Sequence, residues 1–158
     1  MNDSPELNSH HQLLHYQLGA SLGEGGFGQV YQAWDTKLHR HVAIKYLKNV
    51  TAGVDLTREA RLAASLHHPA FVKIHALENT SDGQAIVMEL VPGRTLRQIL
   101  ESNAPGISST LEIVRQVAQA MDEAHRAGLI HGDLKPSNLM QEPSGAVRIL
   151  DFGLATQA

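Results

Sequence analysis

The first half of the chain alternates short apolar runs with polar or glycine-containing turns. Five runs have the length and composition of strands: residues 16–22, 29–34, 41–47, 71–77 and 85–90. Between the third and fourth runs, four apolar residues recur at helical spacing: Leu56, Ala60, Ala63 and Leu66. Pro69 prevents this helix from continuing. The pattern therefore predicts three strands, one helix and two more strands.

The second half has a helical pattern. A short helix is predicted around Leu96, Ile99 and Leu100. A longer helix has its apolar stripe at Leu111, Val114, Val117, Ala118 and Met121. Ser109 and Glu112 have the spacing of a capping box at its start, and Gly128 supplies a C-terminal stop. Two short apolar runs, at residues 139–141 and 146–150, follow.

Residues 1–15 are polar and rich in histidine, and we expect them to form a loose leader. His10, His11 and His15 could approach one another there, but no carboxylate or thiolate completes a ligand set. We therefore expect no metal site in this segment.

Composition excludes several classes of protein. With 13 Lys and Arg against 16 Asp and Glu, the formal charge of −3 argues against a nucleic-acid-binding surface. No stretch approaches the 18 or so apolar residues of a membrane span, and the N-terminus does not resemble a signal peptide. The absence of cysteine excludes disulfides and thiolate metal sites. These observations favour one folded domain in the cytoplasm.

A glycine cluster lies between the first two predicted strands. Gly23, Gly25 and Gly28 would let backbone amides approach phosphate oxygens, although a flexible hairpin turn also explains them. The strand–loop–strand context disfavours a dinucleotide-binding fold, in which a helix follows the loop. In the next strand, Lys45 follows the apolar residues 42–44, and a buried ammonium there would need an anion.

Four other polar residues are candidates for a phosphate and metal site. Glu59, on the predicted helix, could supply a carboxylate to Lys45, although a helical Glu is more often a surface residue. Asp133 and Asn138 lie in a loop between the long helix and a strand, and Asp151 directly follows a strand. Their oxygens are hard ligands suited to Mg²⁺.

Together, these motifs resemble those of eukaryotic-type serine/threonine protein kinases, which also occur in bacteria. The resemblance runs from about Tyr16 to the last residues, with the motifs in the family's order. It implies an α+β kinase fold: a five-stranded antiparallel small lobe with one helix at residues 16–90, then the first part of the helical large lobe at 91–158. It also implies that the cofactors are ATP and Mg²⁺, and that the partner is a protein substrate with a Ser or Thr acceptor.

The resemblance implies a role for each matching residue. Lys45 would hold the α- and β-phosphates with Glu59 as its ion-pair partner, and Asp133 would accept the proton of the substrate hydroxyl. Asn138 and Asp151 would bind Mg²⁺, and Lys135 is typical of serine/threonine kinases. The remaining ATP-binding residues would be the three glycines, Leu22, Val30, Ala43, the gatekeeper Met88, and the backbone of Glu89 and Val91.

One departure from the family pattern lies beside the catalytic aspartate. Gly132 stands where the family has Arg, which suggests that no activation-loop phosphate acts through this position. The sequence His-Gly-Asp at residues 131–133 also resembles small-molecule phosphotransferases of the aminoglycoside and choline kinase type. Those enzymes lack the glycine cluster and usually carry another residue in place of Lys135, so this alternative is the weaker one.

The second departure is at the C-terminus, because the activation segment and later helices of the family do not follow Asp151. We therefore expect an incomplete kinase domain whose apolar stripe at residues 111–121 lacks partners, so that this face could associate with another chain. Two functions stay open: a serine/threonine protein kinase, or a truncated, non-catalytic module that binds nucleotide or a partner.

Overall fold

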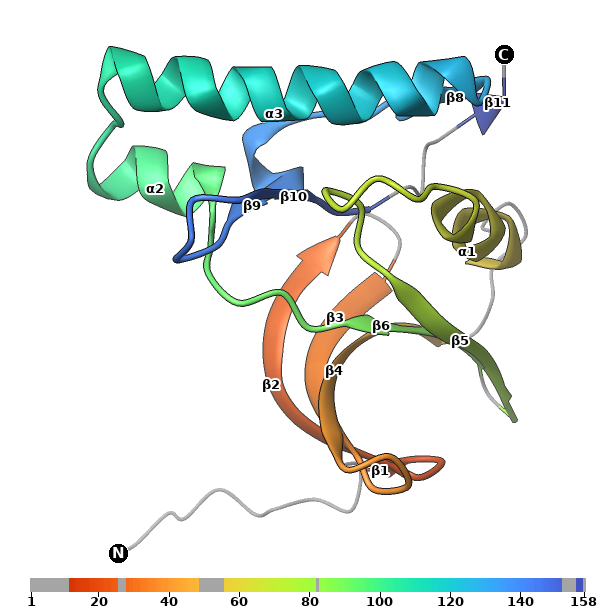
Figure 1. The fold of residues 1–158 in the computed structure, drawn as a ribbon. Coiled ribbons are helices and arrows are strands. Elements are labelled where there is room, and N and C mark those ends of the chain that lie inside the picture. Colours follow the sequence, from red (N-terminus) through yellow and green to blue (C-terminus); the bar gives the residue numbers. More distant parts are fainter. Residues whose placement is uncertain (1–11, 26–27, 49–55, 82, 152–155, 158) are drawn as a thin grey trace, which may run out of the picture.

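The computed structural model describes residues 12–25, 28–48, 56–81, 83–151 and 156–157. In the described residues, a curled antiparallel sheet and one helix form one part of the molecule, and two helices with short strands form the other (Figure 1). The leader expected at residues 1–15 lies mostly outside the described residues. Of its last residues, Gln12–Leu13 forms a short strand, and Leu13 is buried.

The sheet has five long strands and one short one, in the order β1-β2-β3-β4-β6-β5. Their bounds are Gln12–Leu13 (β1), Tyr16–Gly25 (β2), Gly28–Asp35 (β3), Arg40–Lys48 (β4), Ile74–Thr80 (β5) and Gly83–Glu89 (β6). The five long strands and the α+β class are as predicted from the sequence, and β1 is an addition at the edge.

Alternation along the strands divides the sheet into two faces. One face forms a cluster of buried side chains: Leu13, Tyr16, Ala33, Val42, Ile44, Ala85 and Val87. On the other face, Ile86 packs with Ala60 of α1 (Leu56–Ala64), and Met88 lies against this pair. Because successive residues point to opposite faces, Ala43 and Lys45 share the face of Ile86.

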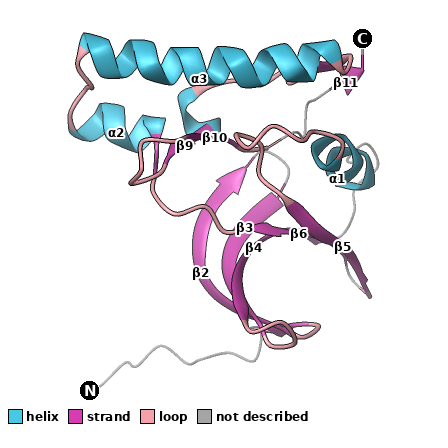
Figure 2. Cartoon of the chain, viewed as in Figure 1, coloured by secondary structure: helices cyan, strands magenta, loops and turns pink. Residues whose placement is uncertain are grey.

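The second part is built around the long helix α3 (Figure 2). Its elements are β7 (Arg94–Thr95), α2 (Leu96–Ser102), α3 (Ile107–Arg126), β8 (Leu129–Ile130), the 3₁₀ turn η1 (Pro136–Asn138), β9 (Leu139–Gln141), β10 (Val147–Ile149) and β11 (Thr156–Gln157). Strand β9 pairs with both β7 and β10, and β11 pairs with β8. Gly128 has φ +73° after the end of α3, as its predicted role as a stop requires.

The predicted capping box at the start of α3 is wrong. The helix begins at Ile107 with Gly106 as its N-cap, so Ser109 lies within the first turn. Glu112 instead forms an ion pair with Arg115, three residues further along the helix. A capping box does occur in α2: the Thr95 hydroxyl accepts from the N–H of Gln98, and the Gln98 side chain accepts from the N–H of Thr95.

The fourth strand was predicted three residues too early, at residues 71–77, whereas β5 begins at Ile74. Phe71 is apolar but belongs to another structure, because it is buried against the second part of the molecule and forms a parallel bridge with Ile149. Tertiary packing therefore overrode the local strand signal.

The largest buried cluster joins the two parts of the molecule. It combines residues of α1 and the segment after it with residues of α3 and the short strands: Leu62, Ala63, Leu66, Ala70, Phe71, Ala120, Met121, Ala124, Leu129, Leu139 and Ile149. This shared core includes Ile149 of β10, and so fixes the strand that leads to Asp151 relative to the sheet. Among the described residues, no helix is long and apolar enough to cross a membrane.

Candidate active site

Lys45 lies in the middle of the sheet and is only 3% exposed. It pairs in register with Val30 on one side and with Ile86 on the other. Its Nζ atom lies 3.1 Å from Oδ1 of Asp151, 106 residues away in sequence. A buried ammonium requires a nearby anion, and this carboxylate is one.

Three predicted ATP-binding residues share the face of Lys45. Val30 pairs with Lys45, and Ala43 pairs with Met88, so the four side chains project from the same side of the sheet. Val91, just after β6, is buried, whereas Leu22 of β2 is half exposed. These positions form an apolar surface next to a buried cation.

The glycine cluster lies at the end of the β2–β3 hairpin, where Gly25 pairs with Gly28 and Gly23 pairs with Val30. Gly28 has φ +148°, and a Cβ atom there would lie 2.8 Å from the backbone oxygen of Tyr46. A larger residue would force this strand away from β4. The two residues between Gly25 and Gly28 lie outside the described part of the chain.

Glu59 is in α1, the helix that packs on the same face of the sheet as Lys45. Its side chain lies outside the described part of the structure, so its pairing with Lys45 stays a prediction.

Asp133, Lys135 and Asn138 form one polar cluster. Lys135 Nζ lies 2.9 Å from Oδ2 of Asp133. Asn138 Nδ2 donates to the backbone oxygen of Asp133 at 2.8 Å and to its Oδ2 at 3.3 Å. The Asn138 amide is 9% exposed, and its oxygen is not used in these two bonds. The cluster therefore holds one carboxylate by two donors and leaves the amide oxygen for another ligand.

His131 connects this cluster to Leu150, the residue that precedes Asp151. The N–H of Asp133 donates to His131 Nδ1 at 3.2 Å, so the ring proton must be on Nε2, which donates to the backbone oxygen of Leu150 at 3.1 Å. His131 is 2% exposed, so its two hydrogen bonds are buried. Gly132 has φ +79°, a conformation that costs most other residues about 1–2 kcal/mol.

Asn138 and Asp151 are brought together by the backbone. The N–H of Leu150 donates to the backbone oxygen of Asn138 at 2.8 Å, so Asp151 follows directly beside it. Asp151 has φ +57°, a left-handed conformation that Asp tolerates better than most residues. Within the described ranges, no group of three His, Cys, Asp or Glu side chains could hold a metal by itself. One carboxylate and one amide suit Mg²⁺, because this ion usually keeps several waters and also binds substrate phosphates.

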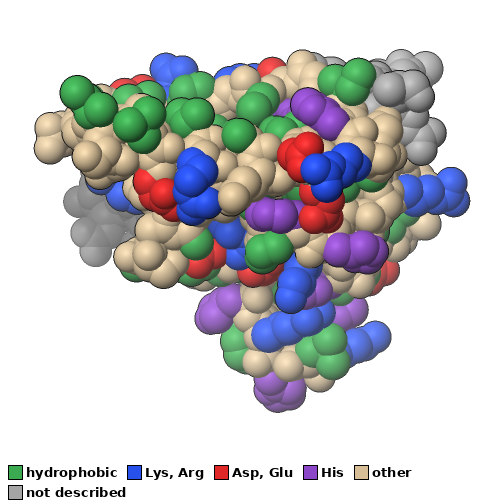
Figure 3. Space-filling view, turned by 45° about the horizontal axis from the view of Figure 1, so that its top comes forward, with side chains coloured by type: hydrophobic (Ala, Val, Ile, Leu, Met, Phe, Trp, Pro, Cys, Tyr) green, Lys and Arg blue, Asp and Glu red, His purple; other side chains and the backbone are tan. Residues whose placement is uncertain are grey.

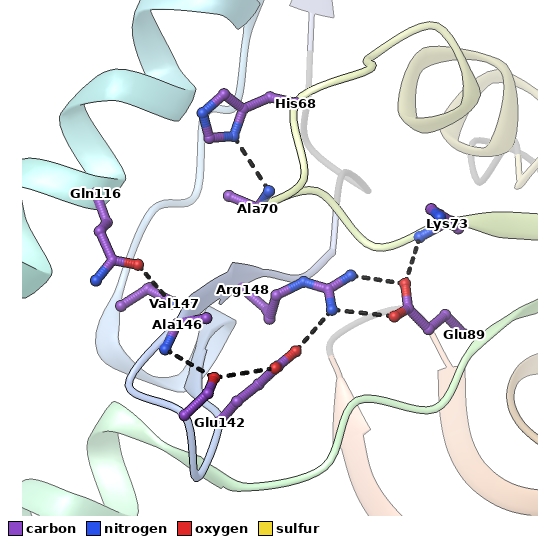
Figure 4. Close-up of polar contacts among 10 residues, drawn as sticks. His68, Ala70, Lys73, Glu89, Gln116, Glu142, Ala146, Val147 and Arg148 are labelled. Carbon is purple, nitrogen blue, oxygen red and sulfur yellow. Dashed lines mark hydrogen bonds and ion pairs between the residues drawn. The ribbon is translucent and has the colours of Figure 1, made fainter.

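Sequence reasoning missed an ion-pair network at the end of β6 (Figure 4). Arg148 of β10 binds both carboxylate oxygens of Glu89, at 2.6 and 3.0 Å, and Oε1 of Glu142 at 2.7 Å. Burial raises the pKa of Glu89, but the hydrogen bonds from Arg148 and from the Lys73 N–H, with their charges, hold it below its usual value. The available signal was a charged residue inside the apolar run 146–150.

The chain is similar to known proteins over most of its length. The family described as protein kinase domain matches residues 16–158. A serine/threonine-protein kinase PknB of Mycobacterium leprae is 41% identical over 150 residues, and a probable PknB of Lactococcus lactis is 42% identical over 147 residues. A probable serine/threonine-protein kinase of Streptomyces coelicolor is 43% identical over 150 residues.

Each of these matches covers 89% of the chain but only 22–24% of the relative. The chain therefore spans about a quarter of the length of these relatives.

Proposed function

Since the chain belongs to the protein kinase domain family, we propose that it takes part in transferring the γ-phosphoryl group of ATP to a Ser or Thr hydroxyl of a protein. The proposal rests on one observation, which is that two groups of residues distant in sequence meet in the structure. The buried Lys45 meets Asp151, which lies beside the Asp133–Lys135–Asn138 cluster.

The protein's own residues would bind and orient the reactants. Val30, Ala43 and Met88 would pack on the adenine ring, with Leu22 at the open edge. The N–H of Glu89 donates to the backbone oxygen of Lys73, so Glu89 would contribute its carbonyl oxygen to adenine. Val91 would contribute its backbone groups. The amides of the glycine cluster would lie over the phosphates.

Asp133 is the residue that would act on the acceptor hydroxyl. As the bond between the γ-phosphorus and the β-phosphate oxygen breaks and the bond to the acceptor oxygen forms, the hydroxyl proton would pass to the Asp133 carboxylate. Lys135 and the Asn138 amide hold this carboxylate in place. Mg²⁺, held by Asn138 and Asp151, would supply charge neutralisation on the phosphates.

Binding of ATP is tested by thermal unfolding with and without Mg·ATP. A ligand at 100 times its dissociation constant stabilises the folded state by about 2.7 kcal/mol, so the wild type should melt at a higher temperature with Mg·ATP. Lys45→Met should abolish this rise, whereas Lys37→Met, at an exposed turn, should keep it. A wild-type melting temperature that Mg·ATP leaves unchanged would contradict the proposal.

Phosphoryl transfer is tested separately, with radiolabelled ATP and a Ser/Thr-containing protein acceptor. Asp133→Asn should reduce the rate by about 10²–10⁴-fold, the usual contribution of a positioned base. ATP binding without transfer that depends on Asp133 would instead favour the second candidate, a nucleotide- or partner-binding module. The exposed apolar residues of α3 are the observation in favour of that candidate.

A further inference from the structure

Arg148 is a buried charge in a strand whose neighbours are apolar. It lies between Val147 and Ile149 in β10 and is 9% exposed. Its guanidinium makes three hydrogen bonds to the carboxylates of Glu89 and Glu142, while its Nε atom is buried without a hydrogen-bond partner. Burying a charge is costly, and apolar side chains of similar volume in the same space are often at least as stabilising. Stability alone therefore does not account for this network.

The network fixes the backbone at the end of β6. Glu89 is the last residue of that strand, and its carboxylate receives a bidentate contact from Arg148 and a bond from the Lys73 N–H at 3.3 Å. The N–H of Glu89 also donates to the Lys73 backbone oxygen at 2.9 Å. Two parallel bonds to a planar guanidinium set orientation as well as distance. Both the side chain and the backbone of Glu89 are therefore held.

The other end of the network is the β9–β10 hairpin. Arg148 pairs with Met140 in this hairpin, and Glu142 lies in its turn. Asn138 immediately precedes β9, and Asp151 comes two residues after β10. The hairpin between the two predicted Mg²⁺ ligands thus holds the end of β6 through Arg148. Figure 4 shows the contacts of Arg148 with Glu89 and Glu142.

We propose that Arg148 is a positioning residue for ATP: it fixes the backbone of Glu89, which would meet adenine, relative to Asn138 and Asp151, which would meet the metal-bound phosphates. The inference rests on the proposed function. Arg148 acts through Glu89 and touches no reactant. The affinity of a ligand that reaches both the Glu89 backbone and the metal site should depend on Arg148. The affinity of a ligand that occupies only the phosphate end should not.

The test compares Mg·ATP with magnesium tripolyphosphate by isothermal titration calorimetry on the full chain. In Arg148→Met, the dissociation constant for ATP should rise about tenfold, equivalent to about 1.4 kcal/mol, while that for tripolyphosphate changes less than about twofold. Arg148→Lys should restore part of the ATP affinity, since lysine keeps the charge but lacks the planar fork. Arg115→Met removes an exposed ion pair of α3 and should change neither constant.

Two results would overturn the role of Arg148. One is an unchanged ATP constant in a folded Arg148→Met variant, and the other is an equal loss for ATP and tripolyphosphate, which a structural role alone would produce. If Arg148→Met does not fold, two other variants are measured with the same two ligands: Arg148→Lys, and Glu142→Gln, which leaves the pair between Arg148 and Glu89 in place. The same comparison of the two dissociation constants then decides the role of Arg148. The proposed function is judged on the wild type and Lys45→Met: a wild type that does not bind ATP overturns both proposals, whereas binding that requires Lys45 but not Arg148 overturns only this one.

Discussion

At the scale of single residues, Asp35 shows how a buried charge is stabilised far from the candidate site. It is 1% exposed and accepts from the N–H groups of Lys37 and Leu38, each at 3.0 Å. His15 Nε2 and Arg40 Nε lie 3.4 and 3.5 Å from its oxygens. Burial raises the pKa of Asp35, but these bonds and charges together hold it below its ordinary value of 3.8.

Asp35→Asn should lower the free energy of unfolding at pH 7 by roughly 1–3 kcal/mol, since the acceptor of the two N–H bonds loses its charge. Because the pKa of Asp35 is lowered in the folded state, its carboxylate contributes its full stabilisation above the ordinary pKa of 3.8. This contribution declines as the pH falls from 3.8 through the folded-state pKa. The difference between variant and wild type in urea unfolding should therefore shrink from pH 7 to pH 3. Asp122→Asn, at an exposed pair with Arg126, is the control. An equal difference at both pH values would contradict this account.

At the scale of elements, one carboxylate of α3 binds the backbone of the segment that follows α1. Glu123 Oε1 accepts from the N–H of His67 at 3.1 Å and from that of His68 at 2.8 Å, in the segment that follows α1. Next to this contact, Ala120, Met121 and Ala124 of α3 enter the core shared by the two parts. The polar contact and the apolar core are thus made by the same turn of the helix.

Glu123→Ala should lower the free energy of unfolding by about 1–3 kcal/mol, because two backbone donors lose their acceptor. Glu112→Ala, on the same helix but exposed and paired only within it, should change it by about 0.5 kcal/mol or less. Chemical denaturation of both variants measures the contrast. Equal losses at the two positions would show that Glu123 does not join the elements.

At the scale of the whole molecule, an apolar stripe on α3 is exposed. Ile107, Leu111 and Val114 are 82%, 64% and 57% exposed, and they recur at helical spacing. Figure 3 shows hydrophobic side chains along this edge of the molecule. Of the stripe predicted from the sequence, Met121 is buried in the shared core, while Leu111 and Val114 are not covered.

We therefore expect the 158-residue chain to self-associate through this stripe as its concentration rises. The double variant Leu111→Gln, Val114→Gln should weaken association roughly tenfold or more, measured by sedimentation velocity. Leu38→Gln provides a matched control, because Leu38 is also 64% exposed but lies in the turn between β3 and β4. Equal association in the double variant and in the wild type would exclude this surface.

By itself, the sequence determined the five long strands, the three helices, the family resemblance and the candidate residues, because periodicity and glycine spacing are local properties. It placed the start of the fourth strand at Phe71, three residues too early, and the start of α3 too late, since burial in the shared core and the choice of N-cap depend on neighbours distant in the chain. Only the tertiary structure brought Lys45 to Asp151 and Arg148 to Glu89, across 106 and 59 residues. Such ion pairs depend on how the sheet and the hairpin pack together, and no local pattern encodes which distant charge a buried one will meet.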